Sequence, residues 1–598
     1  MTEIPLEEIQ EAEQQEQLRI GSLLTVDIGS INTRAALYDT VEGRYRFLAA
    51  GASPTTSDAP MFDASEGVSR TLDRLQAISG RMLKDGDAHL IIPSSADGSG
   101  ADYLATTLSA GAPLKTVVVG LLDEVSLKSV TKLANTIYTH IIETISLNDR
   151  RKSEEQIDTI QQLRPEIILI AGGTDDGASN SVLRLVNSVS LALSLLPESH
   201  RPEVLFAGNH KLAGQVRKSI EPLAHFHIAP NIRPSLAAEQ LGPAQTIFTD
   251  IFRRFQVSRV AGVGELNTLS GGQLLPTSNG LGRVIRFFSK IVPQPTTKGV
   301  LGIDVGASST IVAGGFNGDL RLQVFTRMGI GDGLVGILEG SQLEDITRWL
   351  PLEIPPSYVL DYIQNKITHP TTLPATVEDL YIEQALAREI MRRSVQMAIS
   401  SFPKNAPRIG PNTLPVFDPI MVGGGVLTNA PSPAQSLLII LDALQPVGIQ
   451  RIILDKNNLA PGLGAAAAVT PALVTQLLLD PTAFVNLGFV ISPISRARYG
   501  TAVLRVRIQY ETGHENVVNV EQGNIRTIPL PIGQRARLFL DPLHRADIGF
   551  GPGRSSSLQV VGGPFGIVVD ARGRPLQLPQ SAEKRRSLLI KWLGAFRK

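Results

Sequence analysis

The chain has 598 residues, in which 56 Lys and Arg balance 56 Asp and Glu. One hydrophobic core cannot hold a chain of this length, so we expect roughly three or four domains, and the balanced charge gives no reason to expect a nucleic-acid partner. Without cysteine the chain has no disulfide, thiolate metal ligand or Cys nucleophile, which fits a cytoplasmic protein.

Residues 1–21 are rich in Glu and Gln and contain no apolar run, which predicts an acidic N-terminal tail and argues against a signal peptide. The longest apolar stretch, 463–479, contains Thr, Pro and Gln. A buried helix explains that stretch better than a membrane span.

The first predicted motif is a β-hairpin with a turn of small residues. An apolar strand ends at Asp27, and a second apolar stretch follows Thr33. Small residues let backbone N–H groups approach a phosphate, hydroxyl groups add donors, and an Asp ahead of the turn can hold hydrated Mg²⁺. We therefore expect Asp27, Gly29, Ser30 and Thr33 to bind a nucleotide phosphate, with Asp27 also a metal ligand.

Residues 22–290 are expected to form a first lobe. Within it, about 88–235 alternate apolar strands with helical stretches, which predicts an inserted α/β region with a largely parallel sheet. The proline-containing segment 291–299 is predicted to be a linker.

A second copy of the hairpin opens the expected second lobe, 300–488. Asp304, Gly306 and Thr310 fall at the same spacing as the Asp, Gly and Thr of the first copy. Two facing hairpins would clamp a triphosphate from both sides, although a plain tight turn also explains either copy alone. The residues expected to contact phosphate are Asp304, Gly306, Ala307, Ser308, Ser309 and Thr310, with Asp304 as the second metal ligand.

Three further features complete the chain. An apolar strand runs into Gly423, Gly424 and Gly425, which would allow close approach of adenine or ribose, while a ligand-free turn is as good an explanation. Period-two alternation over 489–580 predicts a small β-sandwich or barrel. Residues 581–598 predict a basic amphipathic helix, for which docking on a neighbouring domain is favoured over a membrane surface or a partner groove.

The order of these motifs resembles that of the actin, Hsp70 and sugar-kinase superfamily. More closely, the chain resembles the MutL/GlmL-type proteins of the adenosylcobalamin-dependent glutamate mutase system, which are unrelated to the mismatch-repair protein of similar name. The most specific match is Ala-Gly-Gly-Thr-Asp-Asp-Gly at 171–177. Further matches follow in the family's order at 94–98, 207–209, 231–234 and 276–277.

The resemblance implies a two-lobed actin-like ATPase fold with duplicated phosphate hairpins, an α/β insert and an additional C-terminal β domain. It also implies a reactivating chaperone that uses ATP and Mg²⁺ to release damaged cobalamin from a mutase subunit, with a homo-oligomer as a further possibility. The chain is not expected to be the mutase itself, because it lacks the cobalamin-binding motif Asp-x-His-x-x-Gly. The nearest approach begins at Asp87 and His89 but has Ile92 at the position where the motif requires Gly.

The chain departs from the family in its second hairpin. Ile311 replaces a second acid, Ala313 replaces His, and in the first hairpin Arg34 stands where Lys is usual. A carboxylate at position 311 would help to order Mg²⁺ or the attacking water, so its loss predicts weak or slow hydrolysis.

Two other classes of function stay open. A non-hydrolysing actin-like scaffold would use the β domain and the terminal helix for partner contacts. A small-molecule kinase would need an acidic general base near the γ-phosphate, for which Asp97, Asp175 and Asp176 are the candidates.

Overall fold

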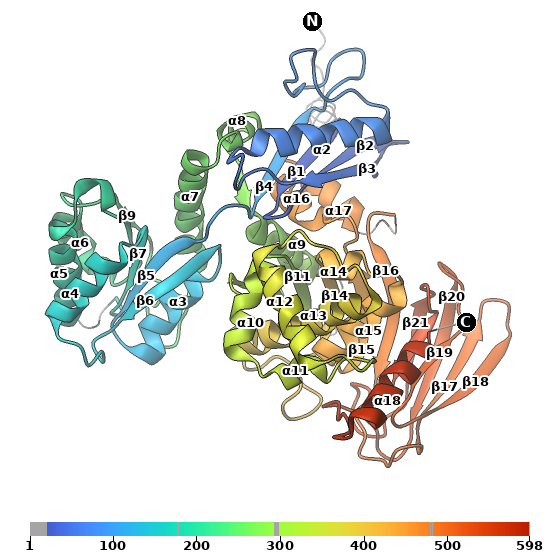
Figure 1. The fold of residues 1–598 in the computed structure, drawn as a ribbon. Helices are drawn as coiled ribbons and strands as arrows, with labels where there is room; N and C mark the ends of the chain where they lie inside the picture. Colours follow the sequence, from blue (N-terminus) through green and yellow to red (C-terminus); the bar gives the residue numbers. More distant parts are fainter. Residues whose placement is uncertain are drawn as a thin grey trace, which may run out of the picture.

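The computed structural model describes residues 21–175, 177, 179–291, 298–478, 480 and 482–596. These residues form two lobes, an α/β insert attached to the first lobe and a β-rich C-terminal region (Figure 1). The fold class expected from the sequence is thus confirmed. All but the last residue of the predicted tail, and most of the predicted linker, lie outside the described residues.

The first lobe is built on a five-stranded sheet with the order β10-β4-β1-β2-β3. Its strands are β1 (Leu23–Ile28), β2 (Asn32–Val41), β3 (Arg44–Pro54), β4 (Tyr103–Leu108) and β10 (Leu275–Pro276). Helix α2 (Ala64–Ser79) packs its apolar stripe on one face, where Leu24 and Val26 point. Because side chains alternate along a strand, Leu23 and Asp27 point to the opposite face.

The insert is a parallel sheet with its own core. Its strand order is β6-β5-β7-β8-β9, and helices pack against the sheet. The strands are β5 (Leu114–Gly120), β6 (Thr139–Ile145), β7 (Ile167–Ala171), β8 (Glu203–Phe206) and β9 (Phe226–Ile228). The helices are α3 (Lys128–Ala134), α4 (Ser153–Leu163), α5 (Asn180–Leu195) and α6 (Ala213–Ile220), with short turns at Asp123–Leu127, Glu198–His200 and His210–Leu212.

The insert is therefore the expected α/β region, but its first strand begins at Leu114 and not near residue 88. The chain before it still belongs to the first lobe, since β4 pairs with β1. Two helices, α7 (Gly242–Arg259) and α8 (Val263–Leu269), lead the chain from the insert back to the first lobe (Figure 1).

The second lobe carries an eight-stranded sheet with the order β13-β12-β11-β14-β15-β16-β22-β19. Its strands are β11 (Gly299–Val305), β12 (Thr310–Phe316), β13 (Asp319–Phe325), β14 (Phe417–Gly423), β15 (Gly448–Leu454), β16 (Val485–Ser492), β19 (Ile525–Ile528) and β22 (Ile567–Asp570). Its other elements are α10 (Val335–Gly340), α11 (Leu343–Thr347), α12 (Pro356–Thr368), α13 (Val377–Ala398), α14 (Gly425–Thr428), α15 (Pro433–Leu444) and turns at Asp332–Leu334 and Ile399–Ser401. Helix α17 (Pro471–Leu478) packs on β3 of the first lobe.

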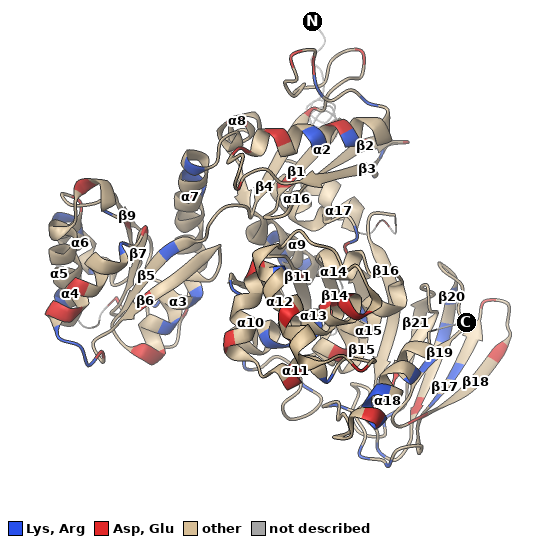
Figure 2. Ribbon diagram, viewed as in Figure 1, with Lys and Arg blue, Asp and Glu red and all other residues tan. Residues whose placement is uncertain are grey.

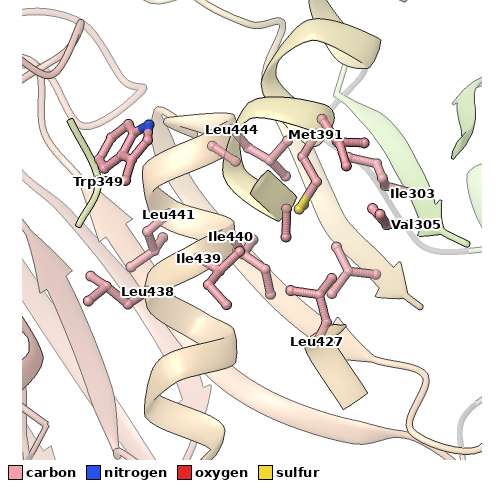
Figure 3. Packing of buried hydrophobic residues seen from close by; sticks show 14 of the residues in the cluster. Ile303, Val305, Trp349, Met391, Leu427, Leu438, Ile439, Ile440, Leu441 and Leu444 are labelled. Carbon is pink, nitrogen blue, oxygen red and sulfur yellow. The ribbon is translucent and has the colours of Figure 1, made fainter. Parts of the chain in front are cut away.

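The main core of the second lobe lies between its sheet and helices α13 and α15. Figure 3 shows Ile440 of α15 on the side towards Met391 of α13, and Leu438 and Leu441 of α15 on the side towards Trp349. Helix α15 is apolar over nearly its whole length because α13, the sheet and the C-terminal helix all pack around it.

Two helices cross between the lobes. Helix α9 (Thr277–Ile291) follows β10 of the first lobe but packs on β11, β12 and β13 of the second. Helix α16 (Leu459–Ala466) follows β15 of the second lobe but packs on β1 and β4 of the first. They meet through glycines: a Cβ added at Gly464 would lie 1.8 Å from the carbonyl oxygen of Gly280. Only glycine permits this approach.

The C-terminal strands are not a free-standing sandwich or barrel. Strands β17 (Ala502–Tyr510), β18 (Glu515–Glu521), β20 (Arg535–Pro542) and β21 (Ser556–Val561) form an antiparallel sheet. Strands β19 and β22 instead extend the sheet of the second lobe, and β16 spans the expected boundary at residue 488. The two layers share an apolar core, so the lobe itself supplies one layer of the expected β domain.

The last helix, α18 (Ala582–Gly594), docks on the second lobe. Leu589 and Trp592 are buried in that lobe's core together with Phe596, and the Trp592 indole N–H donates to Gly523 O at 3.1 Å. Its charged side chains lie around this apolar stripe (Figure 2). The favoured expectation for the basic amphipathic helix is confirmed. Among the described helices, none has the length and apolar character that a membrane crossing requires.

Candidate nucleotide site between the lobes

The duplicated sequence pattern produces the same turn twice. Gly29 N donates to Asn32 O at 3.0 Å, and Gly306 N donates to Ser309 O at 2.9 Å. A Cβ added at either glycine would lie within 3.0 Å of that same carbonyl oxygen. Glycine is needed here because of this close contact and not because of a left-handed backbone.

Both turns leave backbone donors free. The N–H groups of Ser30, Ile31, Ala307 and Ser308 donate to no described residue. Successive N–H groups in a turn form an anion-binding concavity. The two turns therefore offer the kind of backbone donors that a phosphate requires.

Each turn is supported by the segment that follows the third strand of its lobe. Thr55 N donates to Ile31 O at 2.8 Å in the first lobe, and Ile330 N donates to Gly306 O at 2.9 Å in the second. The glycine-rich segment 329–333 packs its backbone directly against the second turn. Its glycine density was the signal that the sequence interpretation overlooked.

Asp27 is held in place from three elements. Its Oδ1 accepts hydrogen bonds from Thr107 Oγ1 at 2.7 Å and from Thr277 Oγ1 at 2.8 Å. Its Oδ2 accepts from Asn458 Nδ2 at 2.8 Å, across the lobe interface. The side chain is 5% exposed, and burial raises the pKa of this carboxyl although the three donors and Arg34 oppose the rise.

Asp304 is the less restrained of the two predicted metal ligands. It is half-buried, and no described residue donates a hydrogen bond to its carboxylate. Burial raises its pKa to about 7; Arg34 opposes this rise, and the nearby carboxyls of Asp27 and Asp455 increase it. A carboxyl of this kind has free oxygens and sits in the field of two further acids.

Asp455 is a third acid in this site, and the sequence interpretation missed it. It follows β15 and accepts hydrogen bonds from Leu459 N and Ala460 N, both at 2.8 Å, at the N-terminus of α16. Burial raises its pKa to about 6. An Asp directly after a buried strand and ahead of a glycine- and alanine-rich helix was the available signal.

Arg34 is the cation of the site. It lies opposite Asp27 in the register of β1 and β2, and it lowers the pKa of all three acids. Its half-buried guanidinium forms no hydrogen bond or ion pair with a described residue. The counterpart of Arg34 in the second hairpin is Ile311, which lies opposite Asp304 and is 2% exposed in an apolar cluster.

The predicted hydroxyl groups are used in different ways. Thr33 and Thr310 are fully buried, and their hydroxyls bond to Thr55 at 2.9 Å and to Met328 O at 2.7 Å. These two side chains are committed to the hairpins, which leaves only their backbone for a ligand. Ser30 and Ser309 are half-buried without a side-chain partner among the described residues, and Ser308 Oγ donates to Asp332 at 2.7 Å.

The three glycines after β14 serve close packing first. A Cβ added at Gly423 would lie 2.9 Å from Asp304 Oδ1, and one at Gly424 would lie 2.2 Å from Val305 O. Gly424 also has a φ of +107°. Gly425 has open space around its Cα and begins α14. The strand-to-helix turn is therefore explained without a ligand, and only Gly425 leaves room for one.

No ready-made metal cage is present in the described parts of the chain, where no three His, Asp or Glu side chains gather in a ligating group. Mg²⁺ bound to phosphate keeps several waters and needs only one or two carboxylates. Asp27 and Asp304 together with the free backbone donors fit that requirement.

The candidate general bases lie elsewhere. Asp97 is exposed and accepts from Ser99, and Asp175 belongs to the insert, where Asn231 Nδ2 donates to it at 2.9 Å. Asp176 lies outside the described residues. Neither described candidate contacts the acids between the lobes.

The family-specific motifs of the insert come together at one edge of its sheet. Asn231, after β9, donates to Gly173 O at 3.0 Å, and Asn209 N, after β8, donates to Gly172 O at 2.9 Å. The motif at 276–277 lies in the interlobe site instead, because Thr277 bonds to Asp27.

Two lobes with matched hairpins, exchanged helices and acids facing each other between them define a two-lobed actin-like ATPase fold. The family model described as "MutL protein" matches residues 23–481, and the chain belongs to that family. The resemblance seen in the motifs is thereby confirmed.

Individual relatives are distant. Protein MutL of Clostridium tetanomorphum is 22% identical over 206 residues, which cover 34% of this chain and only 42% of that relative. Among solved structures, diol dehydratase-reactivating factor in nucleotide-free form is 10% identical, with 77% and 99% of the two chains covered and a TM-score of 0.28. Xylulose kinase from Bifidobacterium adolescentis is also 10% identical, with 76% and 93% covered and a TM-score of 0.28.

Proposed function

We propose that this protein binds ATP with Mg²⁺ between its lobes and acts as a reactivase-like chaperone for an adenosylcobalamin-dependent mutase. The observation that carries the nucleotide part is the pair of matched turns, whose free backbone N–H groups flank Asp27 and Asp304. The partner follows from membership of the MutL family and from the motif resemblance described above.

The charges of the site favour a cationic metal and an anionic phosphate together. Asp27, Asp304 and Asp455 place three acids in one buried region, and Arg34 is the cation that acts on all of them. Mg²⁺ would neutralise phosphate charge and relieve the repulsion among the acids. Arg34, whose guanidinium donors have no partner among the described residues, would contact a phosphate oxygen.

A structural change on nucleotide binding would be transmitted through the elements that join the lobes. The Asn458–Asp27 hydrogen bond and the α9/α16 crossing both connect the turn regions to the opposite lobe. A phosphate held by both turns would favour the closed arrangement of the lobes, and a partner bound to either lobe or to the insert would sense that change.

Slow hydrolysis is part of the proposal. Ile311 places an apolar side chain opposite Asp304, where a carboxylate would help to order the metal or the attacking water. A kinase is disfavoured because neither described candidate base is near the acids. A scaffold that uses the terminal helix on a membrane is disfavoured because that helix is docked.

The nucleotide site is tested by calorimetry with ATP and Mg²⁺. Asp304→Ala should weaken binding at least tenfold, which is about 1.4 kcal/mol. Asp541→Ala, on the distal sheet, is the matched control and should bind as wild type does. Equal affinity of Asp304→Ala and wild type would remove the basis for the proposed site.

The chaperone role needs a separate experiment. An adenosylcobalamin-dependent mutase is inactivated with cyanocobalamin, and its activity is followed after addition of this protein, ATP, Mg²⁺ and fresh coenzyme. Recovery should require both ATP and the intact protein, and Asp304→Ala should not support it. Tight ATP binding without any recovery or mutase association would keep the nucleotide site and eliminate this partner.

A further inference from the structure

A second cavity lies away from the interlobe site. It has a volume of about 740 Å³ and opens between the second lobe and the segment that leads into α18. Its walls come from α11, the end of α13, residues 412–414, the end of α15 and residues 574–580, with Arg585 of α18. This volume is within the range of small-molecule sites.

The lining of this cavity is rich in arginine. Four arginines, Arg348, Arg392, Arg574 and Arg585, face two acids, Asp345 and the exposed Glu344. Arg392 is paired with Glu389 at 2.6 Å, while Arg348 lies 3.3 Å from Asp345 and 3.6 Å from Glu389. The carboxylates of Asp345 and Glu389 are therefore already paired with arginines of the cavity wall.

A buried ion network behind the wall adds positive charge. Arg388 and Arg572 share Asp442, at 2.8 and 2.6 Å, and Arg572 and Arg574 share Asp570, at 2.9 and 2.6 Å. Three guanidinium groups thus share two carboxylates, and all five side chains are at most 7% exposed. The network therefore has an excess of one positive charge, and one of its members, Arg574, also lines the cavity. A buried charge without a counter-ion is costly.

Several donors at the cavity have no acceptor among the described residues. Within that part of the chain, Arg585 donates only to the carbonyl oxygens of Pro579 and Gln580, at 3.2 Å each, and its Nε has no partner. The Nε of Arg348 and the indole N–H of Trp349 are also buried without a partner, and Trp349 is 4% exposed. Burial lowers the pKa of the Arg348 guanidinium, and Arg392 and Arg585 lower it further. Buried donors of this kind normally have partners, so these donors are available to a ligand in the cavity.

We propose that this cavity binds a small anion carrying two or more phosphate or carboxylate groups, with Arg348 and Arg585 as its principal contacts. The planar guanidinium donors match both kinds of oxyanion. Arg348 follows α11 of the second lobe, and Arg585 lies in the first turn of α18. The bound anion therefore joins the C-terminal helix to the lobe, independently of the nucleotide site.

The test uses the full-length protein with inorganic pyrophosphate and citrate as probes, measured by calorimetry and by the shift in melting temperature. At least one probe should bind wild type and raise its melting temperature. Arg585→Gln should weaken that binding at least tenfold, whereas Arg505→Gln, an exposed arginine on the distal β17, should leave it unchanged. Asp304→Asn, which alters only the interlobe site, should leave citrate binding unchanged.

A second variant, which removes a negative charge from the lining, keeps the proposal testable if Arg585→Gln fails to fold. Glu344→Gln removes an exposed acid from the cavity lining and should tighten probe binding about two- to threefold, since a like charge no longer opposes the anion. The proposal is overturned if neither probe binds wild type, if Asp304→Asn loses citrate binding, or if Arg505→Gln weakens binding as much as Arg585→Gln does.

Discussion

Asn458 donates a hydrogen bond of 2.8 Å to Asp27, although the two residues lie 431 positions apart and come from different lobes. The contact links the buried carboxylate of Asp27, in the first hairpin, to a residue of the second lobe. Separation of the lobes must break it, so the position of the lobes and the proposed nucleotide site are coupled at Asp27.

Loss of this contact should destabilise the protein. Asn458→Ala leaves Asp27 Oδ2 buried without its donor, which is expected to cost about 1–3 kcal/mol in the free energy of unfolding. The cost is measured by urea denaturation, with the exposed Asn365→Ala as the matched control. If the two variants lose equal stability, Asn458 does not hold Asp27 in solution.

Stability should fall as pH rises towards neutral. The pKa of Asp304 is about 7 in the folded protein, above its ordinary value of 3.8, so the folded state keeps a proton that the unfolded chain has lost. This contribution is fully present below about pH 4 and is lost as pH rises through 7, with a slope of up to about 1.4 kcal/mol per pH unit for one proton.

Asp304→Asn should therefore flatten the profile of unfolding free energy between pH 5 and 8 and make the protein relatively more stable at pH 8. Asp455, with a pKa of about 6, contributes with the same sign and should keep part of the slope. Urea denaturation at both pH values gives the comparison. An unchanged profile in Asp304→Asn would mean that Asp304 is already ionised at pH 5.

Restoring an acid in the second hairpin should accelerate ATP hydrolysis. Ile311 faces the same side of the hairpin as Asp304, so Ile311→Asp places a carboxylate beside it, and we expect at least about a tenfold faster single-turnover rate. The variant should also be less stable, because the side chain enters an apolar cluster. Ile311→Asn is the control for size and polarity, and equal rates for the two variants would contradict a role for the charge.

The helix crossing should not tolerate a methyl group. Gly464→Ala would place Cβ 1.8 Å from Gly280 O, and the forced separation of α9 and α16 is expected to cost about 1–3 kcal/mol or more. Gly214→Ala in α6 meets nothing within 4 Å and is the control; it should keep or slightly raise stability. Thermal denaturation of both variants measures the difference, and a Gly464→Ala variant as stable as the control would show that the helices can separate freely.

Some of the site follows from local sequence because its cause is local. The two Asp-x-Gly turns of the hairpins have a local cause, since each glycine is needed for contact with a carbonyl only three residues away. The docking of α18 was similarly predictable from the spacing of Leu589, Trp592 and Phe596, because an apolar helical stripe must be covered.

Other parts were not predictable from local pattern. Thr107 and Asn458 carry no motif of their own, and they reach the site only because β4 and the start of α16 are brought beside β1. Strands β19 and β22 have only four residues each, too few for their pattern to assign them to a sheet, and pairing alone placed them in the sheet of the second lobe and not in a separate domain.

The sequence by itself determined the two hairpins, their order, the α/β character of the insert and the loss of an acid at Ile311. Only the tertiary structure decided which hydroxyls are sealed in the hairpins, which acids share the interlobe site, and where the excess arginine charge gathers. The reason is physical: a turn depends on atoms a few residues apart, whereas burial, pKa and charge balance depend on neighbours that the chain brings together from hundreds of residues away.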